Sequence, residues 1–219
     1  RSMSTTYLTL VNSALRRLRE DEVSGVANTA YSKMVGDFVN DAKTTVENSH
    51  DWSELRSTVV VSTSSGTNEY TITGSGDRIK LYSVLNDTSN FFLRYENPTW
   101  FANAEYNSDT VSGSPEKYTF SGVDGSNNSK VKLYPTPDAT YSLRFDVLIR
   151  PGDLSADSDT IVIPEKPIVH LAVALLARER GETGGTTAQD YFALADTALS
   201  DAIAHDAYKN PEEYIYRPV

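Results

Sequence analysis

The residue types best suited to chemistry are the histidines and the serines. Histidine occurs at three positions, His50, His170 and His205, and none of them belongs to an HExxH pattern or another metal-ligand spacing. We therefore expect capping, core or surface roles for all of them. Serine is abundant, but no GxSxG elbow presents one as a nucleophile. These patterns predict a protein that is not an enzyme and that holds no cofactor or metal.

Two further segments resemble ligand-binding loops. Asp153, Asp157 and Asp159 could offer oxygen ligands to a hard cation, but their spacing lacks the glycine and the distal glutamate of an EF-hand loop. A solvated acidic loop is the favoured interpretation. The segment Gly74-Ser75-Gly76 is too short for a phosphate-binding loop, and its place between two candidate strands indicates a turn.

The composition narrows the class of partner. Cysteine is absent, which excludes disulfides and thiolate metal sites. The net charge of -10 argues against a grip on nucleic acid, although a like-charged wall would let DNA pass without sticking. For the basic trio Arg16, Arg17 and Arg19, acidic partners or the neighbouring Asp21-Glu22 are favoured over nucleic acid. No apolar run approaches the ~18 residues of a membrane span, so no membrane contact is expected.

Helical periodicity dominates the beginning of the chain. Residues 5–20 carry an apolar stripe at helical spacing, and residues 28–49 resume the pattern after a break. Asn28 or Thr29 can cap the second helix, and the short connection predicts an antiparallel hairpin. The expected stripe of the first helix consists of Leu8, Val11, Leu15 and Leu18.

From position 57 to 150, apolar and polar residues mostly alternate with a period of two, and turn residues are frequent. Candidate strands are 57–63, 69–73, 78–86, 90–96, 117–122, 130–134 and 141–149. Asn97 and Pro98 predict the start of a short helix anchored by Trp100 and Phe101. Short strands of this kind predict a small antiparallel sandwich or open barrel. The aromatic side chains also leave open a carbohydrate-binding module, provided that they are exposed on one face.

Helicity returns at Pro164, stops at Gly181 and resumes from Thr186 or Thr187. One helix pair cannot bury its own stripe, so we expect the first two helices to pack against the last two. The predicted fold class is α+β, a discontinuous antiparallel helical bundle with an inserted antiparallel β-rich subdomain and an extended C-terminal arm. The expected divisions are 4–52 with 164–206 for the bundle, 53–163 for the insertion and 207–219 for the arm.

The arm is the candidate binding segment. Its sequence, AYKNPEEYIYRPV, has no helical period, yet it is rich in the residue types that favour protein interfaces. Tails that stay disordered are usually poor in aromatic residues. We therefore predict that the arm docks, either on its own fold or on a partner. The candidate contact residues are Tyr208, Tyr214, Ile215, Tyr216 and Arg217.

Four segments together resemble a known family. They are the first helix LTLVNSALRRLRE, the Trp-ended second helix ANTAYSKMVGDFVNDAKTTVENSHDW, the turn LYPTPD, and the returning helix IPEKPIVHLAVALLARERG. In this order, over nearly the whole chain, they resemble the head-to-tail adaptor (connector) proteins of tailed bacteriophages, in particular the tail tubular protein A, or gp4-like, adaptors of podophages.

The resemblance implies a helical bundle with a β-rich insertion, and a ring, commonly a dodecamer, between the portal protein and the tail tube or nozzle. DNA would pass through the ring without specific binding. The arm would reach the portal, and the protein would lie at the head-tail junction of a virion assembled in the host cytoplasm. Another phage neck or tail-completion protein with the same helical plan is the alternative within this class.

Overall fold

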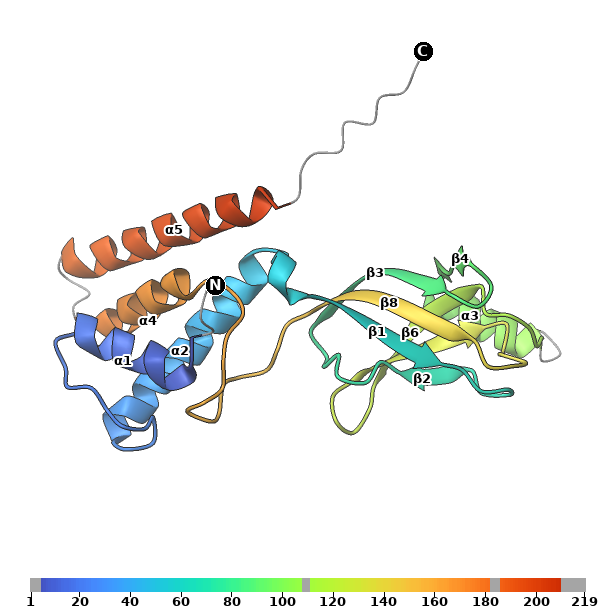
Figure 1. Cartoon of the computed structure of the whole chain (residues 1–219), viewed down its shortest axis with the longest axis horizontal. Coiled ribbons are helices and arrows are strands. Elements are labelled where there is room, and N and C mark those ends of the chain that lie inside the picture. The colour runs from blue at the N-terminus through green and yellow to red at the C-terminus, as the bar shows by residue number, and fades with distance from the viewer. Residues whose placement is uncertain (1–4, 108–110, 182–185, 210–219) are drawn as a thin grey trace, which may run out of the picture. The chain divides into compact units, whose positions relative to one another are not determined.

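The computed structural model describes residues 5–107, 111–181 and 186–209, and it shows an α+β protein, which confirms the predicted class (Figure 1). The chain divides into two compact units. The first unit combines Arg1–Glu54 with Asp153–Val219 and carries four of the α-helices. The second unit, Leu55–Gly152, carries the strands and one short helix.

Both N-terminal helices form where the sequence predicts them, because each has a threonine cap. Helix α1 (Tyr7–Arg17) begins at Thr6, whose side chain accepts a hydrogen bond from the Thr9 amide at 3.2 Å. Helix α2 (Ala30–Ser49) begins at Thr29 with a capping box completed by Ser32.

The buried face of α1 differs from the predicted stripe. Helix α1 contacts both α2 and a helix from the C-terminal half, so the face that it buries is wider than one stripe. Tyr7, Leu10 and Ala14 are buried together with the predicted Val11 and Leu15. The predicted Leu8 and Leu18 are only half-buried, at the margin of this face.

Helices α1 and α2 approach closely at Gly36. A Cβ atom at this position would lie 2.3 Å from the Tyr7 hydroxyl and 2.9 Å from Val26. The absence of a side chain at Gly36 therefore lets the Tyr7 ring lie against α2. Burial, and after it the charges of Asp37 and Asp153, raise the pKa of the Tyr7 hydroxyl.

The C-terminal half adds α4 (Glu165–Glu179) and α5 (Thr186–Ala207) to the first unit. Helix α4 contacts α1, α2 and α5, and it lies between α5 and the N-terminal pair (Figure 1). Its apolar stripe is buried on several sides. Within the described part of the chain, no helix has both the length and the apolar character that a membrane crossing needs.

The second unit contains two four-stranded sheets with the orders β1-β8-β3-β4 and β2-β7-β6-β5. Their strands are β1 (Arg56–Ser62), β2 (Glu69–Thr71), β3 (Ile79–Asn86), β4 (Phe91–Phe92), β5 (Arg94–Tyr95), β6 (Lys117–Val123), β7 (Ser129–Tyr134) and β8 (Ser142–Ile149). The predicted strand 90–96 is divided in two, because its halves pair with different sheets. The pairing of β5 with β6 is parallel, which departs from the expected all-antiparallel pattern.

Both sheets contribute to one apolar core, as in a sandwich. Val84 and Phe145 come from the first sheet and Val131 from the second, and all three are fully buried. Helix α3 (Pro98–Asn107) follows β5. It begins as predicted, since the Asn97 side chain accepts a hydrogen bond from the Trp100 amide at 2.8 Å.

The chain re-enters the first unit at a point fixed by a side chain of α2. The Asn40 amide group accepts a hydrogen bond from the Leu154 amide at 2.9 Å and donates one to its carbonyl at 3.0 Å. The following loop then meets α1, since the carbonyls of Asp159 and Asp157 accept hydrogen bonds from the Tyr7 and Leu8 amides. Residues 153–163 therefore bind to the helices of the first unit.

Candidate functional site

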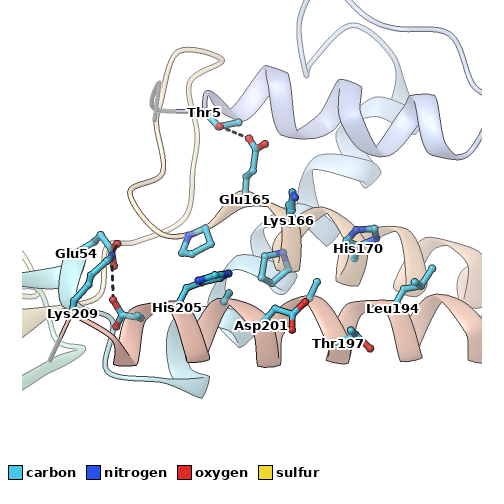
Figure 2. Close-up of a pocket in the computed structure, with 15 residues that line it drawn as sticks. Thr5, Glu54, Glu165, Lys166, His170, Leu194, Thr197, Asp201, His205 and Lys209 are labelled. Carbon is cyan, nitrogen blue, oxygen red and sulfur yellow. Dashed lines mark hydrogen bonds and ion pairs between the residues drawn. The ribbon is translucent and has the colours of Figure 1, made fainter. Parts of the chain in front are cut away.

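A groove of about 720 Å³ opens along α5 in the first unit. One wall is the beginning of α4 with Lys166 and His170, and the other is the second half of α5 with Asp201 and His205 (Figure 2). The beginning of α4 is held in place by Glu165, whose carboxylate accepts a hydrogen bond from the Thr5 hydroxyl.

The α5 wall is a stripe of residues at helical spacing. Leu194, Ala198 and Ala202 form its apolar part, and Leu194 is 51% exposed. Ala195 and Asp206 are the buried side chains of α5 among those described from position 189 onward. Much of the apolar surface of α5 therefore faces the groove and solvent, although the helix packs on α4 along its length.

Asp206 fastens the end of α5 to the segment that follows α2. Its side chain is only 2% exposed and accepts hydrogen bonds from the Ser53 amide at 3.0 Å and from the Ser53 hydroxyl. The His50 ring donates to the same carboxylate at 3.1 Å, and the Lys209 ammonium lies 3.3 Å away. Lys209 also pairs with Glu54 (Figure 2).

The charges of this anchor stabilise one another. Burial alone would raise the pKa of Asp206, but the hydrogen bonds from Ser53 and the Lys209 cation together lower it. The pKa of the Lys209 ammonium is raised, first by its hydrogen bond to Glu54, against the opposing effect of burial. Both groups therefore stay ionised, and they fix the end of α5.

All the histidines of the chain gather around this groove. His170 and His205 line it, and His50 binds Asp206 while its ring meets the buried Trp52 edge to face. Burial, followed by the charges of Arg17 and Lys166, lowers the pKa of His170, so its ring is neutral at neutral pH. None of them belongs to a group of metal-binding side chains within the described ranges.

Of the predicted contact residues, only Tyr208 lies within the described chain. Its side chain is 81% exposed, and its ring meets that of His205 edge to face with centroids 6.4 Å apart. Tyr214, Ile215, Tyr216 and Arg217 lie outside the described residues. The predicted arm began at Ala207, but this residue still belongs to α5.

The acidic loop has a structural role in this unit. Asp157 accepts a hydrogen bond from the Val26 amide at 3.1 Å, and Asp159 accepts one from the amides of Ser155 and Ala156, each at 2.8 Å. These two hydrogen bonds to Asp159 lower its pKa. The loop carboxylates thus satisfy backbone amides of the first unit.

The two aromatic residues that begin α3, Trp100 and Phe101, are largely covered. Phe101 is only 4% exposed. Trp100 is half-buried, and the Lys117 ammonium lies 3.8 Å from the centre of its ring. These two side chains therefore lack the open surface that sugar binding would require. The segment Gly74-Ser75-Gly76 is a turn, in which Gly74 and Gly76 have positive φ values and Ser75 is buried.

A model of the SU10 adaptor protein family matches residues 5–214, which include parts of both units. The chain belongs to this family. The protein is thus a structural adaptor of a bacteriophage virion, and the general resemblance to phage head-to-tail adaptors is confirmed. An adaptor acts by contacting other proteins of the capsid and tail. A search of curated proteins finds no significant match.

The anchor around Asp206 was not anticipated from the sequence. Ser53 and Asp206 are separated by more than 150 positions, and neither belongs to a local motif. The one available signal was the isolated aspartate on the otherwise Ala-rich stripe of the last helix. A buried carboxylate on such a stripe requires donors from elsewhere in the fold.

Proposed function

We propose that this adaptor is a head-to-tail connector whose copies form a ring, most simply a dodecamer, between the portal and the tail tube or nozzle. The family match over residues 5–214 carries this proposal, because it covers both units. The order of the four motifs supports placing the protein with the tail tubular protein A adaptors of podophages. Assembly in the host cytoplasm, followed by incorporation at the head-tail junction, completes the proposal.

The charge of the protein suits a ring through which DNA passes. The net charge is -10, and α5 alone exposes Asp190, Asp196 and Asp201. Surfaces of this sign repel the phosphate backbone, so DNA would move through the ring without being held.

The C-terminal arm is the proposed portal contact. Tyr208 is exposed where the arm begins, and the adjacent Lys209 is held by Glu54 and Asp206. An arm that starts from a fixed point loses less entropy on binding than one attached to a loose end. Tyr214, Ile215, Tyr216 and Arg217 would then supply the aromatic and basic contacts.

The tips of the β unit are the proposed tail contact. Phe92, Tyr95 and Tyr106 are 64%, 56% and 90% exposed. Exposed aromatic side chains of this kind are typical of protein interfaces. The proposal thus assigns the arm to the portal and the β unit to the tail.

Portal binding by size-exclusion chromatography with light scattering tests the proposal. The full chain should co-elute with a portal protein as a complex, and a chain ending at Lys209 should not. A full-length variant with alanine at positions 214–217 should behave like the truncated chain. Failure of the full chain to bind any portal would contradict the connector role and favour another neck or tail-completion protein.

A further inference from the structure

The groove between α4 and α5 has the composition of a docking site. Its apolar part consists of Leu194, Ala198 and Ala202, which α4 leaves partly uncovered. Two of the charged residues that line it, Lys166 and Asp201, form no ion pair with another described residue. A segment that covered the groove would therefore need an apolar centre and charges of both signs.

The chain itself provides such a segment at the end of the groove. Lys209, the last described residue, lines the groove, and Tyr208 already rests on the groove residue His205. The next two residues are Asn210 and Pro211, a pair that favours turn initiation. We propose that, in the free protein, residues 210–219 turn back and dock along the α4–α5 groove of the same chain.

The lengths agree with this proposal. Ten extended residues span about 33 Å. The stretch of α5 from Leu194 to its end at Ala207 rises about 20 Å along the helix axis. The arm is therefore long enough to reverse at Asn210 and still cover the whole α5 wall.

The chemistry of the arm also complements the groove. Glu212 and Glu213 come first, and their carboxylates suit the Lys166 ammonium in the groove. Tyr214, Ile215 and Tyr216 follow and suit the apolar stripe of α5.

Arg217 then offers a cation to Asp201. The groove thus carries a complement to the acidic, the apolar and the basic residues of the arm, with Asp201 beside Ala202 within the apolar stripe. This docking concerns the free chain and does not depend on the ring or portal contact proposed above.

Cysteine cross-linking tests the proposal directly, because the natural chain has no cysteine. The variant Ala198→Cys, Tyr216→Cys places one thiol in the groove and one in the arm. The control Ser200→Cys, Tyr216→Cys moves the first thiol to an exposed position on the far side of α5. Under mild oxidation, the first pair should form a disulfide within one chain at least about tenfold faster than the control.

Three cross-linking results would overturn the proposal. Equal rates for the two pairs, or no disulfide in either, would show that the arm does not select the groove. If the groove thiol of the Ala198→Cys variant forms its disulfide mainly at dimer mass, the arm of another copy fills the groove instead.

A spectroscopic comparison gives a second, independent check without cysteines. In the full chain, serine replaces Tyr214, Ile215 and Tyr216 together, and amide spectra are compared with those of the natural chain. Docking predicts shifts along the groove, at Leu194, Ala198 and Ala202. Shifts confined to residues 205–219 would overturn it.

Discussion

Helices α4 and α5 are neighbours in the chain and in space, yet they bury very different amounts of surface. Helix α4 buries eight side chains, since α1, α2 and α5 surround it. Helix α5 buries only Ala195 and Asp206 among its described side chains. The comparison indicates that α4 carries the stability of the helical unit, whereas α5 is an outer layer held at its end by polar contacts and open along its side.

The largest expected effect comes from truncating the α4 core. Leu176 is fully buried, so Leu176→Ala should lower the free energy of unfolding by about 3 kcal/mol, the cost of lost contacts and a cavity. The matched change in α5, Leu194→Ala, should cost less than about 1 kcal/mol because Leu194 is half-exposed. Urea unfolding followed by helical circular dichroism measures both. Equal losses would contradict the difference between the helices.

The anchor of α5 should respond strongly to the loss of its charge. Asp206→Asn should cost about 2 kcal/mol at neutral pH, because it replaces a carboxylate that accepts two hydrogen bonds from Ser53 and faces Lys209. The control Asp201→Asn, on the exposed groove wall, should change stability by less than about 0.5 kcal/mol. The same urea unfolding experiment measures both variants.

The pH dependence gives a second test of this anchor. The pKa of Asp206 is lowered in the folded chain, so its stabilisation is complete above the unfolded value of about 3.9 and is lost as the pH falls through the folded value. The difference between the natural chain and Asp206→Asn should therefore shrink in acid. A difference that is constant from neutral pH to pH values below about 3 would contradict the assigned charge.

A smaller effect is expected where α1 meets α2. Gly36→Ala should cost about 1 to 2 kcal/mol, because the new methyl group would displace the Tyr7 hydroxyl. Gly125→Ala is the control, since nothing lies within 4 Å of a Cβ atom at that turn. Thermal unfolding of both variants measures the difference. If Gly36→Ala left the stability unchanged, the contact between α1 and α2 would tolerate an added methyl group as easily as an exposed position does.

The smallest effect concerns His170, which lies on the groove wall of α4. Its pKa is lowered by burial and by Arg17 and Lys166, so the unfolded chain binds a proton first as the pH falls below about 6.5. The free energy of unfolding of the natural chain should therefore decrease as the pH falls below about 6.5, and that of His170→Asn should decrease less. Titration of the His170 ring by NMR should give a pKa below the ordinary value. A raised value would contradict the environment described for this wall.

The elements of both units were largely predictable because local patterns specify them. Alternation marked strands such as β7 and β8, and Thr29 and Asn97 marked the starts of α2 and α3. The parallel pairing of β5 was not predictable, since two residues carry no periodic signal.

The functional site was harder to predict than the fold. The groove and the Asp206 anchor arise from residues far apart in the sequence, and no spacing rule brings Ser53 to Asp206. Residue type alone predicts Tyr208 as a contact residue, and its side chain is exposed beside the groove. The roles of Tyr214, Ile215, Tyr216 and Arg217 stay predictions.

The two points where the chain crosses between the units have a consequence for evolution. Ser53, just before the exit, is bound by α5 through Asp206, and Leu154, just after the return, is bound by α2 through Asn40. Both clamps belong to the helical unit and use nothing from residues 55–152. The sequence of the β unit can therefore change without removing either contact that fixes the ends of the helical unit.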